Sequence, residues 1–373
     1  GKLSIPEPGL LELLKKTSHR LSFTDQPANL NQCDVVFFAR DVPMDEAGRI
    51  DLTVIDQLLE TAIPQLVPNV EFIFMGQVPV GFTRKLGERI QRMRPNFPFT
   101  LTYRVETLTI GQAVNDFLHP DRIILGVDRS GEDPSPKALA VLQQPFRCPI
   151  TVGTFESAEL TKSAINVYLG NAVAFVNTIA DLCEKVGANI QEVVAAMKMD
   201  KRFSPLCYWR PGLGFAGGHI ERDLMTLTKL SEEHGLKPHL LQMIVQNSRE
   251  RYLWLVSALD RYVYQTVPTP VLCLWGLAYK KGTDSLHNAH CLKIFRDYGT
   301  RAQIRAYDPI AKLPKSYSDV RVFPDKFSAL DGSDALIILT EWDEFRCNDP
   351  RPFLERMKRP VIIDGVQILE SGV

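Results

Sequence analysis

The residues with the clearest chemical potential stand in one glycine-dense loop, Pro211 to Asp223. Four glycines within seven residues allow the backbone to turn sharply and to approach a ligand closely. They are Gly212, Gly214, Gly217 and Gly218. The polar residues His219, Arg222 and Asp223 follow and lead into a predicted helix, whose N-terminus favours anions. Because an imidazole titrates near neutral pH, His219 is a candidate general base.

A second pair of polar residues, Lys162 and Asn166, stands on a long helical pattern over residues 157–186. The spacing of four residues places both side chains on one helix face, so they can reach into one cleft. Gly187 is a typical C-terminal stop for this helix.

Three segments with different periodicity must position these residues. Short apolar runs alternate with helical patterns before residue 153 and again after residue 270, which predicts parallel sheets covered by helices. Helical patterns dominate between them. The predicted fold class is α/β, with two Rossmann-like parallel-sheet domains joined by a long central helix and a helical middle domain. The expected boundaries are 1–155, 156–267 and 268–373, with Pro268-Thr-Pro270 as a linker.

The overall composition narrows the class of protein. A hydrophobic content of 45% with 23% charged residues is typical of globular chains. The net charge of −1 gives no sign of a nucleic-acid or anionic-membrane partner. Seven cysteines without a CxxC pair predict reduced thiols in a cytoplasmic protein, and no apolar run approaches the ~20 residues that span a bilayer. His287 and His290 lack a third ligand at a recognisable spacing, so no metal is expected.

The glycine-dense loop resembles the catalytic loop of the nucleotide-sugar dehydrogenases. These enzymes oxidise UDP-glucose, UDP-N-acetylmannosamine or GDP-mannose to uronic acids with NAD. Their loop reads approximately G-x-G-G-x-C-x-x-K-D, and the nucleophilic cysteine falls at His219, the lysine at Arg222 and the aspartate at Asp223. The frame of the motif is kept, whereas the nucleophile is replaced.

The resemblance covers nearly the whole chain. Residues 158–166 resemble A-E-L-x-K-x-x-x-N, and residues 276–284 resemble G-L-A-F-K-x-x-T-D. By resemblance, the catalytic residues are Glu106, Lys162, Asn166, His219 and Asp223. The substrate-binding residues implied in the same way are Tyr208, Gly212, Gly214, Arg222 and Lys280, and the cofactor-binding ones are Pro43, Gln77 and Glu106. In the family the lysine supports the oxyanion formed at C6, and the asparagine orders a water or hydroxyl.

Several family motifs are altered. The pyrophosphate-binding turn G-x-G-x-x-G is absent from residues 1–50, so the chain is expected to be a fragment or to have lost that half of the cofactor site. The motif D-x-R-E-S reads Ser285-Leu-His287-Asn288-Ala289, and D-G-R reads Asp364-Gly365-Val366. Both changes remove an arginine.

Two hypotheses follow. In the first, the protein is an NAD-linked oxidoreductase acting on a nucleotide sugar, most simply a UDP-sugar. It does not complete the usual four-electron oxidation, because the family traps the aldehyde as a thiohemiacetal on cysteine and an imidazole cannot form a comparable adduct. In the second, it is a member without catalysis that binds a nucleotide sugar or serves as a structural or regulatory partner. The resemblance also implies a homodimer formed through the middle helices and a role in supplying polysaccharide precursors.

Overall fold

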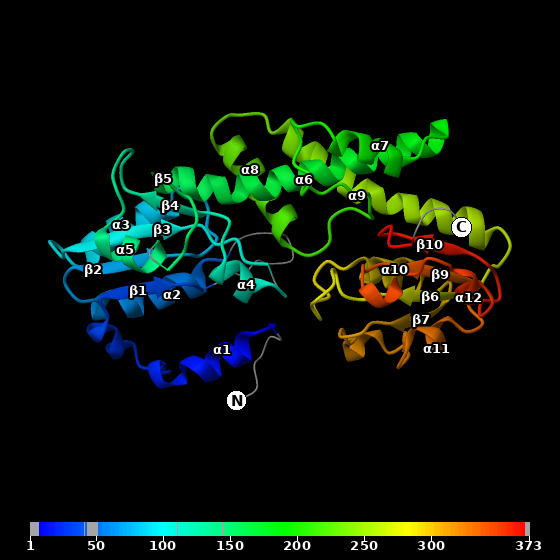
Figure 1. The fold of residues 1–373 in the computed structure, drawn as a ribbon, viewed down its shortest axis with the longest axis horizontal. Coiled ribbons are helices and arrows are strands. Elements are labelled where there is room, and N and C mark those ends of the chain that lie inside the picture. The colour runs from blue at the N-terminus through cyan, green and yellow to red at the C-terminus, as the bar shows by residue number, and fades with distance from the viewer. Residues whose placement is uncertain (1–6, 41, 43–50, 110, 144, 370–373) are drawn as a thin grey trace. The chain divides into compact units, whose positions relative to one another are not determined.

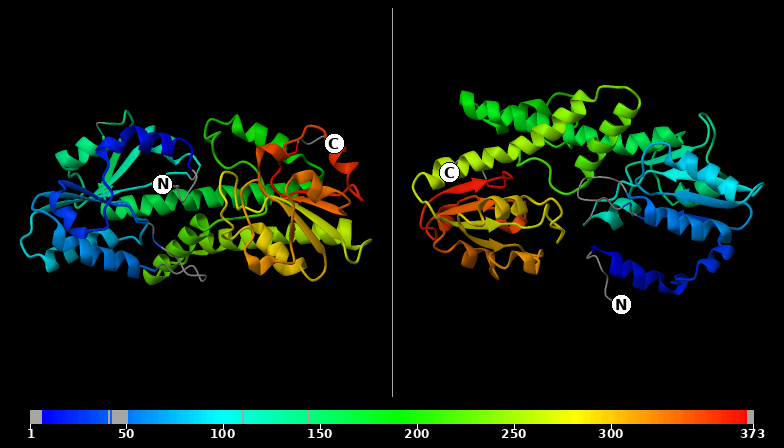
Figure 2. Two further views of the ribbon diagram at one scale, coloured as in Figure 1. Left: turned by 90° about the horizontal axis from the view of Figure 1, so that it is seen from below. Right: turned by 180° about the vertical axis from the view of Figure 1, so that it is seen from behind.

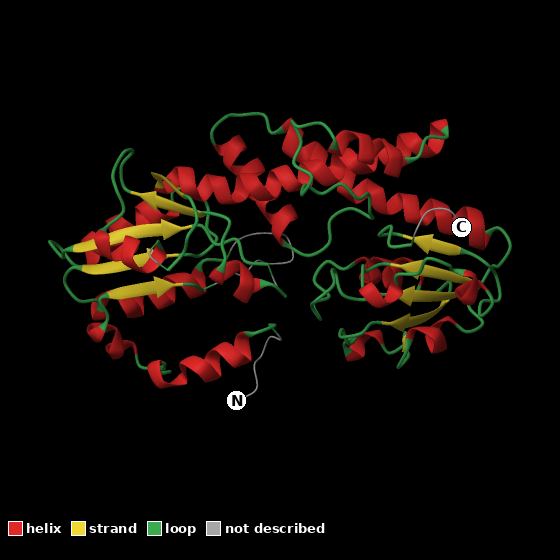
Figure 3. Cartoon of the chain, viewed as in Figure 1, coloured by secondary structure: helices red, strands yellow, loops and turns green. Residues whose placement is uncertain are grey.

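The computed structural model describes residues 7–40, 42, 51–109, 111–143 and 145–369. The chain divides into two compact units, Gly1–Ile165 and Asn166–Val373. Each unit contains a five-stranded sheet with helices around it (Figures 1 and 3). The helix α6 (Phe155–Val186) begins in the first unit and ends in the second.

The first unit is built on a sheet with the strand order β1-β2-β3-β4-β5. Its strands are β1 (Val35–Phe38), β2 (Val70–Phe74), β3 (Phe99–Arg104), β4 (Ile123–Val127) and β5 (Ile150–Thr154). Neighbouring strands are parallel except β3 and β4, which pair antiparallel through Tyr103 and Arg104. The sequence predicts a parallel sheet throughout and is wrong at this pair. The connection between these two strands carries the six-residue α4 (Ala113–Leu118).

Helices cover both faces of this sheet. The helices α2 (Thr53–Ala62) and α3 (Phe82–Met93) and the first turns of α6 pack on one face, and α5 (Pro136–Leu142) packs on the other. Helix α1 (Leu10–Thr17) precedes β1 and has no fully buried residue. Figure 2 shows these layers from two further sides.

A buried carboxylate ties the start of α6 to the start of α3. Glu159 is 1% exposed, and its two oxygens accept hydrogen bonds from the backbone N–H groups of Gly81 at 2.6 Å and Thr83 at 2.8 Å. These amides belong to the N-terminal turn of α3, where no intrahelical acceptor exists. Burial raises the pKa of Glu159 above its ordinary value, against the opposing effect of these hydrogen bonds.

The second unit has a wholly parallel sheet with the order β10-β9-β6-β7-β8. Its strands are β6 (Val271–Trp275), β7 (Gln303–Tyr307), β8 (Arg321–Val322), β9 (Ala335–Ile338) and β10 (Ile362–Asp364). Apolar residues of α9 (His239–Leu259) and α10 (His290–Tyr298) pack on one face, and α11 (Lys326–Leu330) and α12 (Arg351–Leu354) pack on the other.

Two further helices of this unit, α7 (Ile190–Lys198) and α8 (His219–Glu233), flank the glycine-dense loop. Helix α8 begins at His219, with Gly218 as its N-cap. His219 is therefore the first residue of a helix, and Arg222 and Asp223 lie one turn further along it.

Helix α6 alone, among the described helices, is long and apolar enough to cross a membrane by length and composition. The core helix of a soluble protein satisfies the same criterion. Within the second unit, α6 contributes the fully buried Asn177 and the ion-paired Asp181 to protein contacts.

We predict that Glu159→Leu lowers the free energy of unfolding by about 3 kcal/mol, because the buried amide of Thr83 and the half-buried amide of Gly81 lose their acceptor. Glu159→Gln should cost less, since its amide oxygen can still accept one hydrogen bond. The pKa of this carboxyl is raised by folding, so its contribution to stability is fully present below the unfolded-state pKa and is lost as pH rises through the folded-state value. Denaturant unfolding should therefore show wild-type stability falling relative to Glu159→Gln as pH rises from about 4.5 to 7, with 4.5 as the ordinary glutamate value. A pH-independent difference would contradict this account.

Candidate active site

The glycine-dense loop joins α7 to α8 and is packed tightly against other parts of the second unit. Gly214 has a φ of 92°, and a Cβ atom there would lie 2.3 Å from the carbonyl oxygen of Ser248 on α9. Gly217 has a φ of 75°, and a Cβ atom there would lie 2.8 Å from ring carbons of Tyr279. The sequence predicts glycines that let a ligand approach. In the structure, two of the four are required by the protein's own backbone and side chains.

Four polar residues of the second unit form a continuous chain of contacts at the end of this loop. The Nδ2 amide of Asn166 donates to Oδ2 of Asp223 at 2.6 Å. The Nε of Arg222 lies 3.4 Å from Oδ1 of the same carboxylate. The Nη2 of Arg222 lies 3.2 Å from Nδ1 of His219. The structure thus brings together four of the residues that the sequence assigns to the site.

The contact between Arg222 and His219 determines the proton position on the imidazole. A guanidinium group only donates hydrogen bonds, so Nδ1 of His219 must accept with its lone pair. The neutral ring then carries its proton on Nε2. In this geometry neither ring nitrogen offers a free lone pair. The role of general base that the sequence suggests for His219 would require the ring to leave Arg222.

Burial makes this chain of contacts costly to disrupt. The side chains of Arg222 and Asp223 are 6% and 2% exposed, whereas His219 is exposed. A buried charge is tolerated when it is paired and hydrogen-bonded, and each of these two satisfies the other. The buried pair fixes the first turn of α8 and leaves the imidazole at the surface of the second unit.

Tyr208 and Lys280, both implied in substrate binding, lie near Tyr279. The Nζ of Lys280 is 5.8 Å from the centre of the Tyr279 ring. Burial raises the pKa of Tyr279, and the nearby phenol of Tyr208 raises it further. Because the ring of Tyr279 also contacts Gly217, the two residues are close to the glycine-dense loop.

The altered D-x-R-E-S segment also contacts the loop, which the sequence does not reveal. The backbone carbonyl of His287 accepts a hydrogen bond from the N–H of Gly217 at 3.1 Å, and its ring packs against Gly218. The side chain of Asn288 donates to the carbonyl oxygen of Gly217 at 3.2 Å. Burial lowers the pKa of His290 to about 3, and its ring faces the backbone of Gly214. Two residues that replace family motif positions therefore support the loop itself.

Two other predicted residues meet within the first unit. The Nζ of Lys162 on α6 donates to the backbone carbonyl of Glu106 at 2.5 Å. The Glu106 side chain accepts from the N–H of Leu108. Glu106 follows β3 and the half-buried Gln77 follows β2, so both stand at the carboxyl edge of the sheet, where dinucleotides bind in such folds.

Gln77 and Glu106 place an amide and a carboxylate at adjacent strand ends, and both are groups that can hydrogen-bond a carboxamide such as that of nicotinamide. Pro43, the third predicted cofactor residue, lies outside the described residues. The spacing G-x-G-x-x-G occurs at Gly212 to Gly217, but that loop follows α7 rather than a strand. The described part of the first unit contains no such turn.

No group of three or more histidine, cysteine, aspartate or glutamate side chains within the described ranges could hold a metal ion.

All seven cysteines are free thiols. Burial raises the pKa of the thiols of Cys273 and Cys291, to about 12 for Cys291, which makes them poor nucleophiles.

Comparison with known proteins places these features in one family. Three domain models match the chain, namely the NAD binding domain at residues 1–146, the central domain at 156–249 and the UDP binding domain at 273–371. All three describe the UDP-glucose/GDP-mannose dehydrogenase family. A UDP-glucose 6-dehydrogenase of Pseudomonas aeruginosa is 31% identical, over 98% of this chain and 84% of its own length. The chain belongs to this family.

Other relatives agree with this assignment. A UDP-glucose 6-dehydrogenase of Bacillus subtilis is 29% identical, over 98% of this chain and 80% of its own. The structure of a UDP-glucose dehydrogenase from Pyrobaculum islandicum superposes with a TM-score of 0.84 at 24% identity, covering 98% of this chain and 85% of that one. The predicted family and the two-sheet α/β fold are confirmed. NAD as the family's cofactor is supported by the match of residues 1–146.

We predict that Asn166→Asp destabilises the second unit, because it places a second carboxylate against the buried one of Asp223. The loss should be about 2 kcal/mol or more at pH 7 and smaller at pH 5, where one of the two acids can take up a proton. Asn166→Leu, which removes the donor without adding charge, should show a smaller pH dependence. Denaturant unfolding of both variants at pH 5 and pH 7 measures the loss of unfolding free energy. An equal loss for Asn166→Asp at the two pH values would contradict the prediction.

Proposed function

We propose that the protein is an NAD-dependent oxidoreductase that acts on a UDP-sugar and stops after one two-electron oxidation. The observation that supports a stop after the first oxidation is the hydrogen bond between Arg222 and Nδ1 of His219. The family's second oxidation begins when a nucleophile adds to the aldehyde. An imidazole with one nitrogen protonated and the other accepting from a guanidinium has no lone pair with which to add.

The net reaction is the conversion of a primary alcohol and NAD⁺ to an aldehyde, NADH and a proton. Bound NAD supplies the hydride acceptor. The chain's own residues bind and orient the sugar, and the proton of the alcohol is lost to water. An imidazole protonated at Nε2 is a hydrogen-bond donor, and donation to an oxygen atom stabilises negative charge as it develops. The matched UDP binding domain, which includes Lys280, supports recognition of the nucleotide.

The alternative is a member that binds a nucleotide sugar without oxidising it. It is favoured by the packing of His287 and Asn288 against the loop, because the family's arginine and glutamate positions now serve internal contacts.

Thermal denaturation with NAD, NADH, UDP and a panel of UDP- and GDP-sugars separates the enzyme from the binder. A ligand at 100 times its dissociation constant adds about 2.7 kcal/mol. Stabilisation by a dinucleotide and a sugar nucleotide supports the enzyme, and stabilisation by a sugar nucleotide alone supports the binder.

We also propose a homodimer formed through α6, in the cytoplasm, on a route that supplies polysaccharide precursors. Three apolar side chains recur at seven-residue spacing on this helix and are exposed, namely Tyr168, Phe175 and Leu182 at 65%, 46% and 54%. Seven residues make nearly two helical turns, so these side chains form one stripe. An unpartnered apolar stripe of this kind is typical of an interface.

We predict that wild-type protein forms one NADH per molecule of the UDP-sugar oxidised, and that His219→Cys forms two. The thiolate restores a group able to hold the aldehyde as a covalent adduct. His219→Ser is the matched control, since it removes the imidazole without supplying a thiol, and it should not yield the second NADH. Absorbance at the NADH band together with product analysis gives the ratio. Two NADH per sugar from the wild type would overturn the two-electron proposal.

We predict that Phe175→Glu converts the dimer into a monomer, because it places a charge in the centre of the apolar stripe. Val322→Glu, at a residue of equal 46% exposure on the edge strand β8, is the control and should leave the dimer intact. Light scattering coupled to size exclusion measures the mass. A wild-type protein that runs as a monomer at micromolar concentration would contradict the proposal.

A further inference from the structure

The start of the glycine-dense loop is held by buried polar side chains that belong to neither the sugar site nor the cofactor site. Asn177 on α6 is fully buried, and its Oδ1 accepts a hydrogen bond from the N–H of Gly212 at 2.7 Å. Arg251 on α9 is 7% exposed, and its Nε donates to the carbonyl oxygen of Gly212 at 2.8 Å. Both backbone groups of one glycine are therefore bound by side chains from two different helices.

A third contact lies three residues further along the loop. The Oγ of Ser248 accepts a hydrogen bond from the N–H of Phe215 at 2.6 Å, and Ser248 is 6% exposed. Ser248 and Arg251 stand three residues apart on α9, so they lie on the same helix face. This face therefore contacts the loop on both sides of Gly214.

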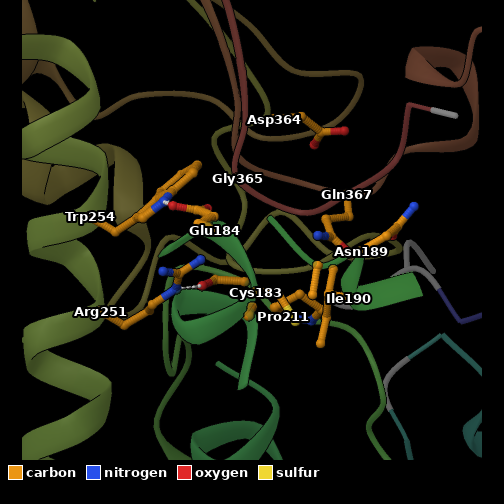
Figure 4. A pocket seen from close by; sticks show the side chains of 13 residues that line it. Cys183, Glu184, Asn189, Ile190, Pro211, Arg251, Trp254, Asp364, Gly365 and Gln367 are labelled. Atoms are coloured by element: carbon orange, nitrogen blue, oxygen red, sulfur yellow. Dashed lines mark hydrogen bonds between the residues drawn. The ribbon is translucent and has the colours of Figure 1, made fainter. Parts of the chain in front are cut away.

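Packing alone does not fix Gly212. A Cβ atom there would meet only the carbonyl oxygen of Gly365, at an ordinary contact distance of 3.6 Å. A hollow of about 320 Å³ adjoins this glycine within the second unit. Figure 4 shows it lined by Cys183 and Glu184 of α6, Arg251 and Trp254 of α9, Asp364 at the end of β10, and Gln367 after that strand. Since space is open on this side, the two hydrogen bonds determine where the loop begins.

The chemistry of the three side chains also favours a positioning role. Polar groups buried in helix faces cost free energy unless they are hydrogen-bonded, so residues needed only for packing would be apolar there. The burial of Asn177 still costs free energy, because its Nδ2 has no hydrogen-bond partner among the described residues. Arg251 also forms an ion pair with Asp181 and packs against the Trp254 ring, 4.7 Å from its centre. These contacts hold the guanidinium in place for Gly212.

We infer that Asn177, Ser248 and Arg251 are positioning residues that fix the backbone of the loop from Gly212 to Phe215 and thereby the site of His219. The inference rests on the proposed function for its effect on substrate, but not for its effect on the loop. Loss of either contact leaves the half-buried amide or carbonyl of Gly212 without its side-chain partner and should favour opening of the loop by about 10-fold.

Hydrogen exchange read by mass spectrometry tests the inference directly on the full chain. Amides of the loop over 212–218 should exchange about 10-fold faster in Asn177→Leu and Arg251→Met, while amides in the sheet of the second unit keep their wild-type rates. Arg251→Lys, which keeps a donor and a positive charge, should restore much of the protection. Arg261→Met, on the exposed surface of the segment that follows α9, is the matched control and should change nothing.

Two outcomes would overturn the inference, namely unchanged loop exchange in folded variants or an equal increase throughout the second unit. Ser248→Ala removes a single oxygen and is the mildest variant. If Asn177→Leu and Arg251→Met fail to fold, Ser248→Ala tests the inference, which then requires faster exchange at the amide of Phe215 alone. UDP titrated into the same variants should bind more weakly in proportion to loop opening. If wild-type protein binds neither UDP nor any UDP-sugar, the proposed function fails, while the exchange result still decides the role of these residues.

Discussion

The site in the second unit depends on the buried carboxylate of Asp223. A charge in this position must be compensated, and Arg222 and Asn166 provide the compensation from the next residue and from α6. Once the guanidinium is held in this way, its remaining nitrogens can donate to the imidazole of His219. The tautomer of that ring, and with it the chemistry open to the site, follows from a pair of buried charges beneath it.

The loop that leads to this helix is shaped mainly by the protein's own groups. The glycines at 214 and 217 avoid collision with Ser248 and Tyr279, and Gly212 is held by side chains of α6 and α9. Backbone amides that are already bound inside the protein cannot also bind a substrate. The loop is therefore best described as a rigid support that places the first turn of α8, while the residues that meet the sugar are carried by the elements it joins.

Much of the fold could be predicted from the sequence, because apolar periodicity and glycine positions report directly on helices and strands. The sequence predicts a helix over residues 157–186 and both sheets, and the structure has this helix over residues 155–186. The motif frame singles out Asn166 and Asp223, which are hydrogen-bonded in the structure. The antiparallel pair β3–β4 was not expected, since strand direction depends on the path of the connection rather than on the strands.

The supporting residues of the loop were also missed, and the reason is physical. Asn177, Ser248 and Arg251 contact the loop from more than 30 residues away along the chain, and a single polar residue in a helical pattern resembles a surface residue. The only sequence signal was their occurrence on otherwise apolar helix faces. The proton position on His219 likewise depends on a contact of 3.2 Å that no spacing rule provides.

Arg222 holds His219 as a neutral ring with its proton on Nε2, and the chemistry open to the site depends on this state. Nitrogen-15 NMR of protein labelled at histidine reads the tautomer of each ring directly, and His219→Ser identifies the signal by its loss. We expect an Nε2–H tautomer for His219 near pH 7, which changes when Arg222 is replaced by methionine. An Nδ1–H tautomer, or a spectrum that is the same with and without Arg222, would contradict it.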